Sequence, residues 1–465
     1  MNNVIFLSGL YSNAISSTMR PISCYQLAWW LRKHGIESQV IEFTQLMNQQ
    51  QLIQLIETCM DETTHTLAIS TVFWPMNPCV IPEPIKSTVQ YIKQKYPNLT
   101  ILAGGNNAYR FDNTGTFFDV KMTGDSEDSI LDYCQQKKFN AVLPNEKFNI
   151  VSCQHRYSKK DLILEHEAVP MELGRGCIFK CKFCSSANLG KPKGTYQRNY
   201  EYVFDEIKYN YENFGTTHYM FLDDTINEDP EKVAFLATIS KRLGVQITWS
   251  GYIRVDLIWS HKNHDVLFDS GLRNAYFGLE SFHPEASKII GKGWNGSHGK
   301  DWIPHLYNDL WNKQVKIEAS FIVGLPKEPE ESFYETAKWI ADLQAGNMFF
   351  YALDLKHNTK DSALESVFTR EYPKYNYVIT ENDQWYNTET GFTRHSSSQL
   401  SDKLNAIIRA SKPTVGGWTS NHLYNVGMSL EEIRHTTLHD LGYILAAKKD
   451  KFINGYIDKF LNLYR

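Results

Sequence analysis

Residues 171–184 read MELGRGCIFKCKFC, a strand-like run followed at once by Cys177, Cys181 and Cys184. Further strand-like runs alternate with helical patterns such as EYVFDEIKYNYENF and EESFYETAKWIADL. We expect these later strands at 218–224, 246–252, 274–280, 316–324 and 347–355. Six successive βα units predict a partial, open barrel of parallel strands. The cysteines then lie at the C-terminal strand ends, where folds of this kind carry their chemistry.

A separate alternation precedes the cysteines. We expect strands in VIFLSGL, SQVIEF, TLAISTVF, LTILAGG and FFDVKMTGD, with helices near 20–34, 46–60 and 81–95 and from about Ser126. Helical crossovers of this length predict a parallel sheet covered on both faces. The sequence therefore indicates an α/β protein: a doubly wound, Rossmann-like domain at 1–137, a polar linker at 138–170, the barrel at 171–360 and a mainly helical region at 361–465.

Composition narrows the class of protein. A chain of 465 residues is longer than one compact domain usually is. Its 48 basic and 52 acidic residues give a net charge of -4, so it lacks the basic excess that is typical of nucleic-acid binders. No apolar run approaches the roughly 18 residues that span a bilayer, and no positive residue precedes the short apolar run at the N-terminus. We therefore expect a soluble, cytoplasmic protein, whose eight cysteines do not form a disulfide framework.

Three cysteines in eight residues are one ligand short of a closed structural metal site. Three thiolates can hold three irons of a cubane cluster and leave the fourth iron open to another ligand. A structural zinc ion instead takes four ligands, and no second cysteine pair follows Cys184. From spacing alone, an open iron–sulfur cluster is favoured, while zinc and a chance grouping of thiols remain alternatives.

At this point the sequence resembles the radical S-adenosylmethionine (SAM) enzymes. Their signature is a cysteine, three residues, a cysteine, one residue, an aromatic and a cysteine, and CIFKCKFC matches it with Phe183 as the aromatic. The resemblance implies a 4Fe-4S cluster whose open iron binds SAM. An electron then cleaves SAM to methionine and a 5'-deoxyadenosyl radical, which abstracts hydrogen from a substrate. It also implies a small electron donor such as flavodoxin or ferredoxin.

The resemblance also assigns SAM contacts at successive strand ends. These candidates are Asp223, Asp224, Ser250, Arg254, Glu280 and Gly324. Carboxylates suit the SAM amino group, arginine suits its carboxylate, and a glycine permits close approach of backbone to adenine. Ser320 stands where the family has the first glycine of its adenine-binding stretch. Taken singly, such residues also cap helices or form structural ion pairs.

The first domain resembles the cobalamin-binding-type domain of one radical SAM subgroup. That resemblance places Ser70, Thr71, Gly104 and Gly105 along a crevice at the strand ends, and Asp125 and Glu127 match the acidic final loop. The first loop, SGLYSNAISSTMRP, lacks the Asp-x-His-x-x-Gly pattern and its cobalt-ligating histidine. Many members of the subgroup lack this histidine and some bind no cobalamin, so cobalamin is a possible third cofactor.

Three functions remain open. The first is a radical SAM enzyme that uses SAM alone for rearrangement, dehydrogenation or a similar reaction, and it is the interpretation that we favour from sequence. The second is a cobalamin-dependent radical SAM methyltransferase, and the third a non-catalytic iron–sulfur or zinc module. Asp354, Lys356 and His357 follow the sixth strand as candidate substrate contacts, and Cys153 is read as an ordinary thiol. The substrate cannot be read from the chain.

Overall fold

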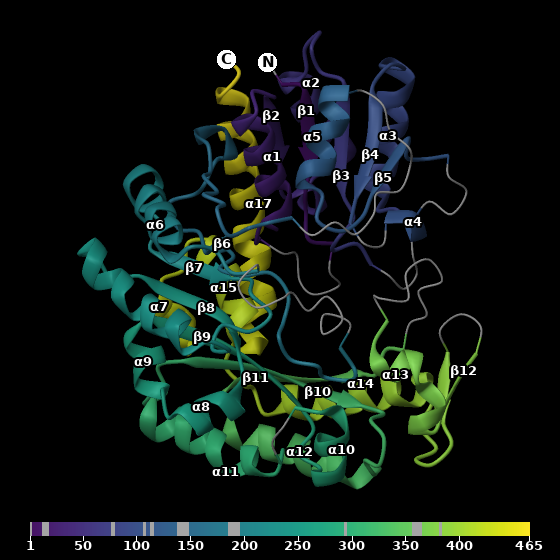
Figure 1. Ribbon diagram of the computed structural model, residues 1–465, viewed down its shortest axis with the longest axis vertical. Coiled ribbons are helices and arrows are strands. Elements are labelled where there is room, and N and C mark those ends of the chain that lie inside the picture. Colours follow the sequence, from purple (N-terminus) through teal and green to yellow (C-terminus); the bar gives the residue numbers. More distant parts are fainter. Residues whose placement is uncertain are drawn as a thin grey trace.

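Two parallel sheets lie one beyond the other along the long axis of the computed structural model (Figure 1). The structure describes residues 2–11, 18–75, 80–105, 108–111, 116–136, 148–184, 196–292, 295–355, 365–380 and 384–465. The five-stranded sheet lies beside both chain termini, and the six-stranded sheet forms the other half of the molecule (Figure 1).

The first sheet has the strand order β2-β1-β3-β4-β5, with every neighbouring pair parallel. Its strands are β1 Val4–Leu7, β2 Ser38–Ile41, β3 Thr66–Ser70, β4 Thr100–Gly104 and β5 Val120–Met122. The helices between them are α1 Ser23–Lys33, η1 Thr44–Leu46, α2 Gln49–Cys59, α3 Glu83–Lys95, α4 Ala108–Phe111 and α5 Glu127–Gln136. This order reverses direction between β1 and β3, as doubly wound sheets do.

Side-chain alternation along β1 explains why helices cover both faces of this sheet. Val4 and Phe6 pack in the core that contains α1 and α5, whereas Ile5 and Leu7 pack in the core of α2 and α3. Successive strand residues point to opposite faces, so an uninterrupted apolar run needs cover on each. The predicted Rossmann-like fold is confirmed.

The second sheet has the order β11-β10-β9-β8-β7-β6, again with parallel pairs throughout. Its strands are β6 Val169–Met171, β7 His218–Phe221, β8 Thr248–Ile253, β9 Leu272–Glu280, β10 Lys316–Val323 and β11 Gly346–Ala352. Its helices are α6 Tyr200–Phe214, α7 Pro230–Leu243, α8 Val255–His261, α9 His264–Asp269, α10 Pro284–Ile290, α11 His298–His305, η4 Leu306–Leu310 and α12 Glu330–Leu343. The order follows the chain from β6 to β11, which confirms the predicted open, partial barrel.

The first barrel strand lies two residues earlier than the expected MELG. It ends at Met171, because the N–H of Leu173 donates to the Asp223 carboxylate (2.8 Å) and not to a neighbouring strand. The strand therefore begins inside the stretch that the sequence assigns to a linker. In the described part of that stretch, the regular elements are β6 and the short helix η2 Lys159–Asp161.

The last hundred residues pack against both halves of the molecule. They form α13 Val367–Arg370, η6 Tyr372–Tyr375, the hairpin β12 Tyr377–Ile379 and β13 Trp385–Asn387, α14 Arg394–Ala410, α15 Gly417–Asn425, α16 Leu430–His435 and α17 Leu438–Asn462. Helix α14 packs on β11, whereas α17 reaches back to α2 of the first domain (Figure 1). Tyr456 and Phe460 of α17 are buried in that domain's core.

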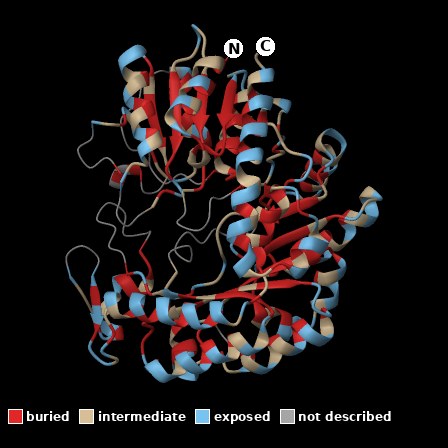
Figure 2. Ribbon diagram, turned by 180° about the vertical axis from the view of Figure 1, so that it is seen from behind, coloured by how far each residue is buried: buried red, intermediate tan, exposed pale blue. Residues whose placement is uncertain are grey.

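One apolar core joins the two sheets. It contains Val4 and Phe6 of β1 together with Met171 of β6 and Phe321 of β10. Figure 2 shows buried strands inside both halves and exposed surface on the outer helices. Among the described residues, none of the helices has the length and apolar character needed to cross a bilayer.

Candidate functional site

The cysteine loop follows β6 and is held at its far end by backbone hydrogen bonds. The N–H of Lys182 donates to the carbonyl of Ile290 at the end of α10 (2.9 Å), and its carbonyl accepts from the N–H of Phe368 (2.9 Å). The N–H of Cys184 donates to the carbonyl of Cys181 (3.1 Å). Two helix ends therefore fix the segment that carries the last two cysteines.

The loop closes one side of a cavity of about 370 Å³ inside the barrel. Six of the predicted cluster ligands and SAM contacts line it: Cys177, Cys181, Cys184, Asp224, Arg254 and Glu280. They come from the loop and from the ends of three different strands. Because the C-terminal ends of parallel strands meet at one edge, residues spread over a hundred positions come together here.

Arg254 joins the cysteine loop to the third barrel strand. Its guanidinium lies 3.8 Å from the ring centroid of Phe179, and its Nη1 is 3.9 Å from the Sγ of Cys181. Asp256 accepts two hydrogen bonds from the same guanidinium (3.0 and 2.7 Å) and so fixes its orientation. Burial raises the pKa of the Cys181 thiol, while Lys292 and Arg254 oppose that shift. The two cations favour a thiolate, the form that binds iron.

Glu280 ends β9 in a backbone conformation that is unusual for its residue type. Its φ is +64°, in the left-handed region, where a non-glycine residue costs free energy. Lys292 lies 3.1 Å from its carboxylate and donates a hydrogen bond to the carbonyl of Gly278. The conformation turns a carboxylate into the cavity, beside the cysteines.

Three other predicted SAM contacts lie outside the lining of this cavity. Asp223 is 2% exposed and pairs with Lys232 (3.1 Å), and the hydroxyl of Ser250 accepts a hydrogen bond from an amide. Gly324 has a φ of +97°, and a Cβ there would come within 2.5 Å of the Trp385 ring. All three have internal structural partners, and their roles toward a cofactor stay predictions.

The structure adds cavity residues that sequence reasoning missed. Thr225 places its hydroxyl 3.8 Å from the Sγ of Cys177, and Lys292 pairs with Glu280. Glu318 lines the cavity from β10, together with Ser320, which the sequence already indicated. A signal for Glu318 was present, because a carboxylate two residues before Ser320 interrupts the apolar strand KIEASFIV. Nothing in the sequence indicates Lys292, which follows α10 and reaches the site only in the folded chain.

The remaining sequence candidates lie elsewhere. Asp354 is 3.7 Å from Arg394 and does not line the cavity, while Lys356 and His357 fall outside the described residues. Cys153 is partly buried, and its Sγ contacts the carbonyl of Asn149 (3.8 Å).

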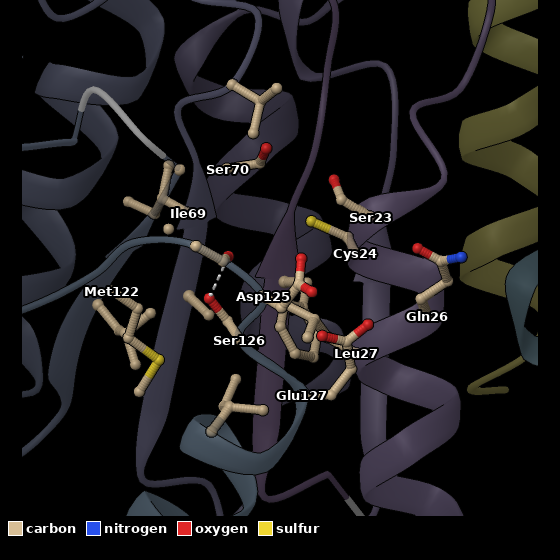
Figure 3. A pocket seen from close by; sticks show the side chains of 18 of the residues that line it. Ser23, Cys24, Gln26, Leu27, Ile69, Ser70, Met122, Asp125, Ser126 and Glu127 are labelled. Carbon is tan, nitrogen blue, oxygen red and sulfur yellow. Dashed lines mark hydrogen bonds between the residues drawn. The ribbon is translucent and has the colours of Figure 1, made fainter. Parts of the chain in front are cut away.

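A second cavity, of about 470 Å³, opens at the strand ends of the first sheet (Figure 3). The predicted residues Ser70, Gly104 and Gly105 line it, together with apolar side chains of β1, β3 and β4. A Cβ at Gly104 would meet no atom within 4 Å, so the missing side chain leaves room in the crevice. Asp125, Ser126 and Glu127 close one side, as Figure 3 shows.

Thr71 supports this crevice without lining it. Its N–H and its hydroxyl both donate to the carbonyl of Gly104 (2.8 and 3.0 Å). Gly105 has a φ of +128°, and a Cβ there would come within 2.8 Å of the Thr71 hydroxyl. The glycine is therefore required for the turn that shapes the crevice.

Arg175 connects the two cavities. It lines the crevice, stands two residues before Cys177, and lies 2.5 Å from Glu127 and 3.0 Å from Glu172. Gln26 of α1 donates to the same Glu172 carboxylate (2.5 Å). A buried network of hydrogen bonds and ion pairs thus holds the cysteine loop against the first domain.

The residues of both cavities fit the groups that the sequence suggests. In the part of the chain that the structure describes, no three Cys, His, Asp or Glu side chains converge as ligands of a single ion. The three thiols instead lie along a cavity wall, as a cluster needs when each thiolate binds a different iron. The glycine-lined crevice leaves space for a flat group against backbone.

The comparisons with known proteins agree with this architecture. Residues 171–340 match the model of the radical SAM superfamily. A Pyrococcus horikoshii protein named an uncharacterised methyltransferase is 30% identical over 171 residues, which are 36% of either chain. The bacteriochlorophyllide d C-12(1)-methyltransferase of Chlorobaculum tepidum is 25% identical over 37% of either chain. The matched segments thus span little more than a third of these curated relatives.

A solved structure extends the likeness to both domains. The radical SAM methyltransferase TsrM of Kitasatospora setae, with cobalamin and a 4Fe-4S cluster bound, is similar to 97% of this chain and is covered over 100% of its own length. The TM-score is 0.65 at 13% sequence identity, a level that shows a shared fold. The cysteine loop at the barrel's strand ends lies within residues 171–340, and this segment matches the radical SAM superfamily.

Proposed function

We propose that this chain is a cobalamin-dependent radical SAM methyltransferase. The observation that carries the proposal is that one loop lines both cavities. Arg175 lines the crevice, and Cys177, two residues later, lines the barrel cavity. The proposal also draws on the relatives, of which the three described above are named as methyltransferases. It reverses the preference for SAM-only chemistry that the sequence suggested.

In the barrel, the three cysteines would hold a 4Fe-4S cluster and leave one iron for SAM. A one-electron donor such as a flavodoxin or ferredoxin would supply the electron for the cleavage of SAM. Arg254 is placed to pair with a carboxylate, and its Asp256 partner prevents its rotation. Asp224 and Glu280 supply carboxylates for an ammonium group at the same edge.

In the crevice, backbone and small side chains would hold the nucleotide tail of cobalamin, a cofactor that supplies a transferable methyl group when bound. Ser70 and Gly104 border the space, and Thr71 holds the carbonyl of Gly104 in place. Among the described residues that line the crevice there is no histidine, so none of them supplies an imidazole ligand for cobalt. Binding would therefore depend on shape and backbone contacts.

The SAM-only enzyme remains a second candidate because of one observation. The loop after the first strand lacks the Asp-x-His-x-x-Gly pattern in the sequence, so binding of cobalamin does not follow from that loop. Both functions require the cluster, and they differ only in the crevice.

The test begins with protein reconstituted anaerobically with iron and sulfide. It should hold about four irons per chain, and replacing Cys177, Cys181 and Cys184 together by alanine should remove both the iron and reductive cleavage of SAM. Tight zinc binding without iron would contradict the cluster assignment.

The second step separates the two functions. Protein incubated with hydroxocobalamin should keep the corrin spectrum after gel filtration. Gly104→Leu should lose it, because the new side chain would extend into the crevice from a Cβ that meets no atom within 4 Å. Gly442→Leu, at a helical glycine whose Cβ also meets nothing within 4 Å, is the matched control. Wild-type protein that retains no corrin, while it still cleaves SAM, would refute the methyltransferase proposal in favour of the SAM-only enzyme.

A further inference from the structure

The wall of the barrel cavity includes a row of side chains on three adjacent strands. Tyr252 of β8 is the register partner of Tyr276 of β9, which is the partner of Glu318 of β10. Register partners in parallel strands point to the same face, so the three side chains lie beside one another in the cavity wall.

Helix α15 adds a fourth side chain to this row. Its start reads Gly416-Gly417-Trp418, and a Cβ at Gly417 would come within 2.5 Å of the Tyr276 ring. The two glycines therefore let the helix approach the barrel closely enough for Trp418 to enter the cavity wall. The Trp418 ring centroid lies 5.4 Å from that of Tyr276 and 6.3 Å from that of Tyr252.

Glu318 is the charged member of this group and has no cationic partner among the described residues. One carboxylate oxygen accepts a hydrogen bond from the backbone N–H of Trp418 (2.9 Å). The two cations of the same cavity are occupied elsewhere, Arg254 with Asp256 and Lys292 with Glu280. Burial raises the pKa of the Glu318 carboxyl to about 7. A carboxylate removed from water without a partner costs free energy, and a bound cation would supply the missing charge.

The aromatic rings favour the same kind of occupant. Tyr351 of β11, 55% exposed, lines the cavity with Phe349, whose ring centroid lies 6.3 Å away. Burial and the Glu318 carboxylate both raise the pKa of Tyr351, to about 12, so the phenol stays neutral. Neutral aromatic faces around one carboxylate attract organic cations through cation–π contacts. An anionic group would meet Glu318 directly, and a purely apolar group would leave it unpaired.

We propose that Glu318, Tyr252, Tyr276, Tyr351 and Trp418 form the substrate subsite, and that it binds a positively charged organic group such as an alkylated or protonated amine. The inference rests on the proposed function, because it assigns the substrate of that same cavity. Glu318 is the third residue of β10, two positions before Ser320 and therefore farther from the strand end that carries the SAM candidates. Glu318 and its register partners therefore lie in the same cavity as the predicted SAM contacts, a few residues farther back along their strands.

The test uses a cation of fixed charge and its neutral analogue of the same shape. Choline and 3,3-dimethyl-1-butanol are titrated into reconstituted protein with SAM present, and binding is followed by saturation-transfer NMR of the ligand. Choline should bind at least about tenfold more tightly than the alcohol, since a charge-assisted contact is worth about one decade of affinity or more. Equal binding of the two would overturn the proposal.

Two substitutions locate the effect. Glu318→Gln keeps the shape and the acceptor for the Trp418 N–H, so it should fold and weaken choline binding about tenfold. Tyr351→Leu removes an exposed ring and should weaken choline a few-fold. Glu331→Gln, at an exposed position of α12, is the control that should change nothing. Unchanged choline binding in Glu318→Gln would refute the assignment.

A pH titration gives a readout that needs no variant. Choline does not titrate, and the groups facing Glu318 from β8, β9 and β11 are Tyr252, Tyr276 and Tyr351, each with a pKa raised by burial. Choline affinity should therefore fall as the pH drops below about 7, and a flat profile from pH 8 to 5 would contradict the proposal. Wild-type protein that does not cleave SAM would refute the proposed function instead, while the contrast between choline and the alcohol still reports on the subsite.

Discussion

Replacing Arg175 by methionine should destabilise the protein and loosen the cysteine loop from the first domain. The guanidinium lies 2.5 Å from Glu127 and 3.0 Å from Glu172, and the three side chains are 15%, 5% and 11% exposed. Methionine keeps an unbranched, apolar side chain but removes the cation that these two carboxylates and Asp125 (3.7 Å) share. Removing one partner of a buried ion pair costs about 3–5 kcal/mol, and the remaining exposure of Arg175 favours the lower end, about 3 kcal/mol.

The assay is urea unfolding of wild type and variant at pH 7, with the free energy of unfolding compared at a common slope. Lys160→Ala is a suitable control, because Lys160 also joins the segment after the first domain to that domain, through Glu37, but the two side chains are 37% and 53% exposed. An exposed pair of this kind should cost at most about 1 kcal/mol.

The double variant Arg175→Met/Glu127→Gln tests the physical cause. Burial raises the pKa of Glu127, and Arg175 opposes that shift, so without arginine the neutral glutamine should be better tolerated than the carboxylate. The double variant should recover about 1 kcal/mol or more of the loss. Two results would contradict this reasoning. One is an Arg175→Met variant that loses no more unfolding free energy than Lys160→Ala, and the other is a double variant that is less stable than Arg175→Met alone.

Two further predictions concern buried charge. Lys232→Met should lower the free energy of unfolding by about 3 kcal/mol or more, because the fully buried ammonium pairs with Asp223 and Glu228. A loss under about 1 kcal/mol in a urea titration would show that these ion pairs do not stabilise the protein. His218 is buried and hydrogen-bonded to Asn421, and burial lowers its pKa to about 4. Its folded pKa lies below the unfolded value of about 6.5, so its contribution is present above that pH and lost as the pH falls toward 4. Replacing His218 by glutamine should flatten the decline in unfolding free energy over that window, and an unchanged slope would contradict the assignment.

The sequence by itself determined the two-sheet architecture. The apolar run of β1 is continuous because both faces of its sheet are covered, and the spacing of six later runs matches β6 to β11. It also determined the cysteine loop, because ligand spacing within eight residues is a local property of the chain. The first barrel strand was placed two residues late, since the bond from Leu173 to Asp223 that ends it joins residues fifty positions apart.

Only the tertiary structure decided which candidates share a site. Asp223 and Asp224 are adjacent in sequence, yet Asp224 lines the cavity while Asp223 pairs with Lys232. Both residues follow β7, which ends at Phe221, so their sides depend on the path of the loop and not on strand alternation. Glu318 and Trp418 are a hundred residues apart and come together through strand register and the close approach of α15, which pattern and spacing along the chain do not encode.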